Sequence, residues 1–192
     1  ITDRWKSLAS LEEPAFDQAY NQAVLDYYQD YAKVADTADS HHKWGYRLLK
    51  QDRYAEALKE FSRALEINPR RNNSYFNMGA CYEYLREYDL ALKYYAKELT
   101  VDPNDADVLP REGRVLYKAG RYREALARLD AALLRSPQGD TYYYRGLALE
   151  ALGSREEAER SFKEALRLDA QDEEASKALA RLMATPSKRP TL

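Results

Sequence analysis

The feature that most constrains this chain is a repeat with a period of 34 residues. Four glycines mark it, the first three spaced by 34 residues and the last by 33: Gly45, Gly79, Gly113 and Gly146. Four alanines follow in the same order: Ala57, Ala91, Ala125 and Ala158. A chain that repeats itself at this period folds as a stack of similar units, each of which packs on its neighbours.

Each unit contains two stretches with helical periodicity. In the first unit, Trp44, Gly45 and Leu48 lie on one face of a helix, and Ala57 and Phe61 lie on the matching face of a second helix. Neither helix can bury its apolar face alone, so the two must pack together. The recurring glycines and alanines are expected where helix axes cross, since a larger side chain there would overpack at a cost of about 1–3 kcal/mol.

The turn between the two helices has a glycine in only two of the units. Gly120 and Gly153 stand at the end of a first helix, where a left-handed residue commonly ends the helix. Asp52 and Arg86 occupy the equivalent places. Those two turns must therefore accept backbone strain or adopt another geometry.

Prolines close three of the units: Pro69, Pro103 and Pro137. The helices that follow are expected to begin at residues whose side chains can cap a helix: Asn72, Asp105 and Asp140. On this basis the chain divides into an N-terminal helical extension or degenerate repeat, four repeats, a capping helix and a tail predicted to be disordered. These segments are 1–37, then 38–71, 72–105, 106–138 and 139–172, then 173–184, and finally 185–192.

The N-terminal extension carries apolar and aromatic residues every three to four positions: Phe16, Tyr20, Ala23, Tyr27, Tyr31 and Val34. This spacing predicts a long amphipathic helix. Its acidic residues outnumber its basic ones. Three roles stay open for this helix: a cap on the stack, a dimerisation element, or a lid that lies in a groove.

Composition and motifs exclude several classes of function. The formal net charge of -2 argues against a nucleic-acid partner, which needs a basic face, and no apolar run is long enough to span a membrane. The single cysteine, Cys81, excludes an intrachain disulfide. Adjacent His41 and His42 cannot share a helical face, so no metal site is expected. No phosphate-binding loop or nucleophile elbow occurs, and therefore no catalytic residue, metal or cofactor is predicted.

The chain begins with Ile1 rather than methionine, so the N-terminus is expected to be trimmed. Location in the cell is therefore left open, with the cytoplasm favoured.

The order of small, aromatic and proline residues in four units resembles the tetratricopeptide repeat family. This resemblance implies an all-α, right-handed solenoid of helical hairpins whose first helices line a concave groove. In that family the groove receives a peptide or helix of another protein. The residues that the resemblance places there are Tyr46, Phe76, Asn77, Tyr84, Arg111, Arg114, Tyr143 and Tyr144. The implied function is that of a non-catalytic adaptor, present as a monomer or a weak homo-oligomer.

Three other functions stay open. One is a heat-shock co-chaperone, a subclass of the family that clamps a terminal carboxylate. Asn77 and Arg111 occupy two clamp places, but His42, Tyr46 and Asp107 depart from the pattern, and Asp107 would repel a carboxylate. The others are a secretion-type chaperone and a structural protein that assembles through its exposed repeat ends.

Overall fold

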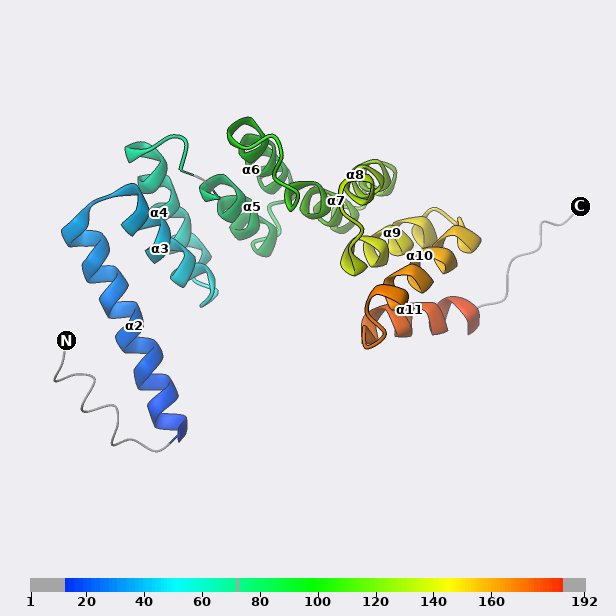
Figure 1. Cartoon of the computed structure of the whole chain (residues 1–192), viewed down its shortest axis with the longest axis horizontal. Helices are drawn as coiled ribbons and strands as arrows, with labels where there is room; N and C mark the ends of the chain where they lie inside the picture. The colour runs from blue at the N-terminus through cyan, green and yellow to red at the C-terminus, as the bar shows by residue number, and fades with distance from the viewer. Residues whose placement is uncertain (1–12, 72, 185–192) are drawn as a thin grey trace, which may run out of the picture. The chain divides into compact units, whose positions relative to one another are not determined.

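Residues 13–71 and 73–184, the part of the chain that the computed structural model describes, contain ten helices and no β-strand (Figure 1). The all-α fold expected from the repeat is therefore confirmed. The helices are α2 (Glu13–Ala35), α3 (Ala38–Leu49), α4 (Tyr54–Ile67), α5 (Ser74–Tyr84), α6 (Tyr88–Val101), α7 (Val108–Lys118), α8 (Tyr122–Arg135), α9 (Gly139–Ala151), α10 (Arg155–Leu168) and α11 (Glu173–Ala184). The predictions for residues 1–12, Asn72 and the tail 185–192 lie outside the described residues.

The chain forms two compact units, Ile1–Leu85 and Arg86–Leu192. In the first unit α3 and α4 pair as a helical hairpin, α2 packs on α3, and α5 packs on α4. In the second unit α7 pairs with α8 and α9 with α10, while α6 packs on α7 and α11 packs on α10. The boundary between the units falls inside the segment 72–105 that was predicted as the second repeat.

A reciprocal cap explains why α3 begins at Ala38. The hydroxyl of Thr37 accepts a hydrogen bond from the backbone N–H of Ser40, and the Ser40 hydroxyl accepts one from the N–H of Thr37. Two N–H groups at the helix start would otherwise have no partner within the helix. The cap therefore starts the first hairpin.

Three of the four repeat glycines lie where two helices of one hairpin cross. A Cβ atom added at Gly45 would lie 2.9 Å from the Phe61 ring, and one at Gly113 would lie 2.5 Å from the Leu129 side chain. A Cβ atom at Gly146 would lie 2.5 Å from the Phe162 ring. Real Cβ atoms do not approach this closely, so these hairpins close only around glycine.

The side chains opposite these glycines make up the core. The four repeat alanines are fully buried, and so are the large residues one turn later in the second helices: Phe61, Tyr95, Leu129 and Phe162. Gly79 is buried in α5. Burial of this repeated set contributes to the apolar stabilisation of each hairpin.

A left-handed residue follows the first helix in all four predicted repeats. Gly120 and Gly153 have φ values of 76° and 80°, as expected. Asp52 and Arg86 adopt the same geometry, with φ of 59° and 62°. Of the two alternatives for these turns, the structure therefore contains strain in a residue other than glycine.

Two of the expected helix starts are wrong. The cap residue of α9 is Gln138, and Asp140 lies in the first turn of the helix. The cap residue of α7 is Asp107, whose N–H donates to the carboxylate of Asp105 two residues earlier. Asp105 thus closes a local turn before the helix instead of capping it.

The capping helix expected at the C-terminal end is α11. It buries Ala175, Ala178 and Leu182. Its polar side reaches back along the second unit, since Arg181 forms an ion pair of 2.6 Å with Glu150 of α9. One face of α11 therefore completes the core while the other meets solvent.

Candidate functional site

The candidate groove residues fall into two sets, one in each compact unit. Tyr46, Phe76, Asn77 and Tyr84 lie on α3 and α5 of the first unit. Arg111, Arg114, Tyr143 and Tyr144 lie on α7 and α9 of the second unit. All eight residues lie on first helices.

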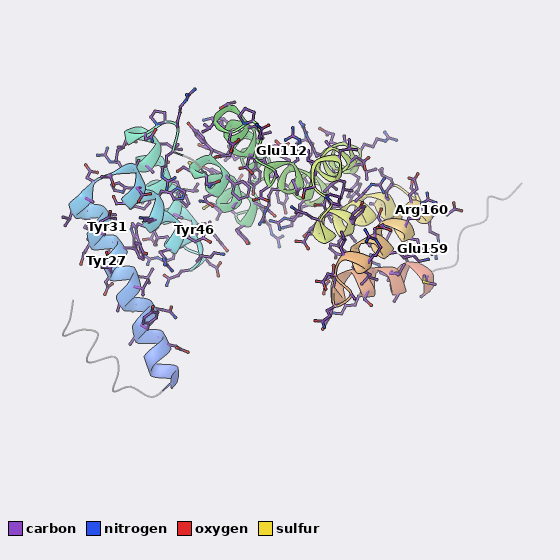
Figure 2. All side chains as sticks on the ribbon, viewed as in Figure 1. Tyr27, Tyr31, Tyr46, Glu112, Glu159 and Arg160 are labelled. Atoms are coloured by element: carbon purple, nitrogen blue, oxygen red, sulfur yellow. The ribbon has the colours of Figure 1, made fainter. Side chains whose placement is uncertain are left out.

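In the first unit, two tyrosine rings are left open to solvent. Tyr46 is 42% exposed and Tyr84 is 56% exposed. The ammonium group of Lys50 lies 5.5 Å from the centre of the Tyr46 ring, and the Tyr84 ring stacks on Tyr54 with centroids 5.1 Å apart. Figure 2 labels Tyr46 among the side chains of this unit. These contacts hold each ring in place while part of its surface stays accessible.

Phe76 and Asn77 are less accessible than the two tyrosines. Phe76 is half-buried, and Asn77 is buried. Little of the Asn77 amide therefore reaches solvent from this face of α5.

His42 lies beside these residues and is neutral at pH 7. Its Nδ1 is 2.8 Å from the hydroxyl of Ser74. Desolvation, followed by the positive charge of Arg71, lowers the pKa of His42 to about 4. The residue that stands at a lysine place of the carboxylate clamp thus carries no charge.

In the second unit, Tyr143 and Tyr144 form a cluster of rings with the Arg114 guanidinium beside it, whereas the contacts that define this cluster do not include half-buried Arg111. The guanidinium carbon of Arg114 lies 5.9 Å from the centre of the Tyr144 ring. Tyr143 meets Tyr144 edge to face at 5.2 Å, and Tyr117 meets Tyr144 in the same manner at 5.9 Å. Desolvation raises the pKa of Tyr143 and of Tyr117, so their hydroxyl groups stay protonated.

Sequence reasoning did not count the tyrosines of α2 among the groove candidates, although they form an exposed aromatic surface. The rings of Tyr27 and Tyr31, both labelled in Figure 2, stack with centroids 6.2 Å apart and planes at 4°. Both are exposed. The guanidinium of Arg47 on α3 covers the ring of Tyr28 at 4.8 Å. The signal was present in the sequence as tyrosines four residues apart.

Glu112 is a second residue that sequence reasoning missed. It is buried in α7 and lines an open cleft of about 500 Å³ in the second unit. The available signal was its position: the residue before the repeat glycine is Trp44, Met78 or Arg145 in the other repeats, and a carboxylate only here.

Two further observations bear on the class of site. No group of three or more His, Cys, Asp or Glu side chains in residues 13–71 and 73–184 is arranged to hold a metal ion. Among the described helices, none is both long and apolar enough to cross a membrane.

Comparison with protein families gives two matches, both described as tetratricopeptide repeat. One family model matches residues 38–71 and 73–105, and another matches residues 111–173. Together they span the predicted repeats of both compact units.

Curated relatives share these segments at moderate identity. The chain is 31% identical over 100 residues to an Hsp70-Hsp90 organizing protein of Triticum aestivum, covering 52% of this chain and 17% of that protein. It is 35% identical over 106 residues to intraflagellar transport protein 70A of Bos taurus, covering 55% of this chain and 15% of that protein. The chain thus spans less than a fifth of the length of these relatives.

Among solved structures, the fold is similar to that of MamA from Desulfovibrio magneticus RS-1, determined from its residue 41 to its end. The TM-score is 0.70 at 25% identity, over 76% of this chain and 82% of that one. The likeness therefore extends over most of both chains.

Proposed function

Because the chain belongs to the tetratricopeptide repeat family, we propose that it is a non-catalytic interaction module. In this proposal, the first helices of its repeats bind an extended or helical segment of another protein. Stacked repeats of this kind present extended surfaces that can bind other proteins. Their stability depends on the contacts between neighbouring repeats.

The observation that carries the proposal is the exposure of Tyr46 and Tyr84 on first helices. The aromatic residue Phe61 on the second helix of the first hairpin is, by contrast, fully buried. Full burial of a large apolar side chain contributes about 1.5–3 kcal/mol, so covering two half-exposed rings would supply a useful part of a binding free energy. Tyrosine loses little rotamer freedom when it is covered, which suits it as an anchor.

Charges near the rings indicate what the bound segment contains. Lys50 lies beside Tyr46 in the first unit, and Arg114 lies beside Tyr144 in the second. A guanidinium presents a planar set of donors that matches a carboxylate. The partner segment is therefore proposed to combine apolar or aromatic side chains with acidic groups.

A co-chaperone role is the second candidate, and the similarity to Hsp70-Hsp90 organizing proteins favours it. In that role the module would hold the terminal carboxylate of a partner. The neutral, half-buried His42 at a lysine place argues against it, and so does the exposed carboxylate of Asp107. If the chain does not clamp a terminal carboxylate, a partner peptide with a free C-terminus and its amidated form should bind equally well. A co-chaperone clamp would bind the amidated form more weakly.

The test is a pulldown with the immobilised chain, identification of the captured protein by mass spectrometry, and biolayer interferometry of variants. The double variant Tyr46→Ala/Tyr84→Ala should bind at least about tenfold more weakly, which corresponds to about 1.4 kcal/mol. Lys59→Ala, an exposed residue of the second helix α4, is the matched control and should bind as the wild type does. Circular dichroism should show unchanged helicity in both variants.

The proposal is wrong if the double variant binds within twofold of the wild type while Lys59→Ala loses binding. The functional surface would then lie on the second helices.

A further inference from the structure

The cleft beside Glu112 is lined by residues of α6, α7 and α8, and its lining does not include the eight groove candidates proposed above. Its volume is about 500 Å³. The lining residues are Asp89, Leu92, Lys93, Ala96, Glu112, Leu116, Arg121, Glu124, Ala127 and Arg128. Apolar side chains and three charges of each sign thus meet in one cavity, in the region where Figure 2 labels Glu112.

The carboxylate of Glu112 lacks the partners that a buried charge requires. Its side chain is only 6% exposed, and its Oε2 atom accepts no hydrogen bond from the described residues. The nearest cation is Nε of Arg128, 3.3 Å away and outside hydrogen-bond geometry. Desolvation raises the pKa of Glu112 more than the charge of Arg128 lowers it. A buried acceptor left in this state is costly unless a donor reaches it.

The next repeat shows what such a position can hold. Arg145 stands where Glu112 does, and its guanidinium donates to the carboxylate of Asp130 at 2.6 Å and to the hydroxyl of Ser161 at 2.7 Å. Asp130 belongs to the third repeat, and at the corresponding place the second repeat has the small side chain of Ala96. The Arg145 guanidinium thus fills a space between Asp130 and Ser161. The equivalent space one repeat earlier, here called the slot, has no guanidinium from the residue at the equivalent place. That residue is Glu112, whose carboxylate lies at the edge of the slot.

We propose that this cleft binds a guanidinium group from outside the chain, namely an arginine side chain of another protein, with the Glu112 carboxylate as its acceptor. Two N–H groups of a guanidinium match the two oxygens of a carboxylate. The aliphatic stem of the arginine would lie against Leu92 and Leu116.

Arg128 does not block this occupant. Its side chain is 54% exposed, and its contact with Glu112 is long. Because Nε of Arg128 makes no hydrogen bond to Oε2 of Glu112, the exposed Arg128 side chain can turn to solvent when a donor with better geometry arrives. Arg121 is already held by Glu124 at 2.6 Å and by Asp89 at 3.4 Å. The incoming cation therefore meets no net positive charge in the cleft.

The experiment is an NMR titration of the ¹⁵N-labelled chain with N-acetyl-arginine methylamide. The matched probe is N-acetyl-citrulline methylamide, which has nearly the same shape but is neutral. The arginine compound should give saturable shifts at Glu112 and at its neighbours in α6 and α8. The citrulline compound should bind at least tenfold more weakly. Equal shifts with both compounds, or shifts spread over the chain without saturation, would overturn the proposal.

Three variants separate the site from the rest of the surface. Glu112→Gln keeps the shape of the side chain and should lose at least tenfold in affinity, while its melting temperature stays the same or rises because a desolvated charge has been removed. Ala96→Leu should fill the slot and also abolish binding. Glu159→Gln, on α10 and paired with Lys163 at 2.6 Å, should bind as the wild type does. Undiminished binding by folded Glu112→Gln would contradict the proposal.

A second arm identifies the source of the guanidinium. The peptide acetyl-Gly-Gly-Arg-Gly-Gly-amide should bind more tightly than the capped arginine, since a protein segment adds contacts along the cleft. Equal affinity for the two would overturn the assignment to a protein segment and point to a free guanidinium compound.

Discussion

Gly146 is the residue at which the packing of this chain can be tested most sharply. A Cβ atom there would lie 2.5 to 2.9 Å from three carbons of the Phe162 ring, which is fully buried and cannot move aside as a flexible chain end would. Gly146→Ala should therefore lower the free energy of unfolding by about 1–3 kcal/mol. The measurement is urea denaturation followed by circular dichroism.

Gly139 is the matched control for that variant, because it lies in the same helix. A Cβ atom at Gly139 has its nearest neighbour 3.7 Å away, an ordinary contact. Gly139→Ala should be neutral or stabilise by about 0.4–1 kcal/mol, since alanine restricts the unfolded chain. If the two variants were equally stable, the close crossing of α9 and α10 would not determine the packing.

His42 makes stability depend on pH. Its pKa is about 4 in the folded chain against 6.5 in the unfolded chain, so between these values the unfolded chain binds the extra proton. The contribution of neutral His42 is thus complete above about pH 6.5 and is lost as pH falls toward 4. Lowering the pH from 7 to 5 should cost on the order of 1 kcal/mol, after allowance for solvent screening.

Thermal melts of the wild type and of His42→Gln at both pH values measure this effect. Glutamine keeps a hydrogen-bonding group near Ser74 but cannot titrate. An identical fall in melting temperature for both proteins would place the pH dependence elsewhere, for example in the ion pairs of Asp36 or Asp39.

At the scale of the helix and turn, the most informative elements are the two strained turns. Arg86 adopts a φ of 62° without a glycine. Arg86→Gly should stabilise the chain by about 0.5–1 kcal/mol, because glycine pays no steric cost in this region. Gly120→Ala, at a φ of 76°, is the reciprocal change and should destabilise by a similar amount. Chemical denaturation measures both, and a destabilised Arg86→Gly would show that the arginine side chain matters more than its backbone.

The turns also show how far sequence reasoning reaches at this scale. The left-handed residues could be located because the repeat register aligned Asp52 and Arg86 with Gly120 and Gly153. The starts of α7 and α9 could not be located in this way. An aspartate near the start of a helix can cap the helix, close a turn before it or lie in its first turn. Asp105 and Asp140 took the last two of these roles. Which role is taken depends on the path of the preceding chain, and no local pattern records that path.

At the scale of the whole molecule, the period of the repeat was sufficient for the fold class, but not for the candidate sites. The register placed all eight candidate groove residues on first helices. It could not show that Asn77 is buried or that Tyr46 and Tyr84 are open, since those differences depend on the packing of neighbouring helices. The Glu112 cleft is lined by residues of α6, α7 and α8, so no single motif marks it.

The central claim is that the first helices bind a partner segment. Hydrogen–deuterium exchange of the chain, alone and with the protein captured in the pulldown, tests it most directly. We expect added protection in α3, α5 or α9, and none in α4 and α10 beyond their values in the free chain; α7 and α8 do not discriminate, since both line the Glu112 cleft. Protection confined to α4 or α10, with α3, α5 and α9 unchanged, would contradict it.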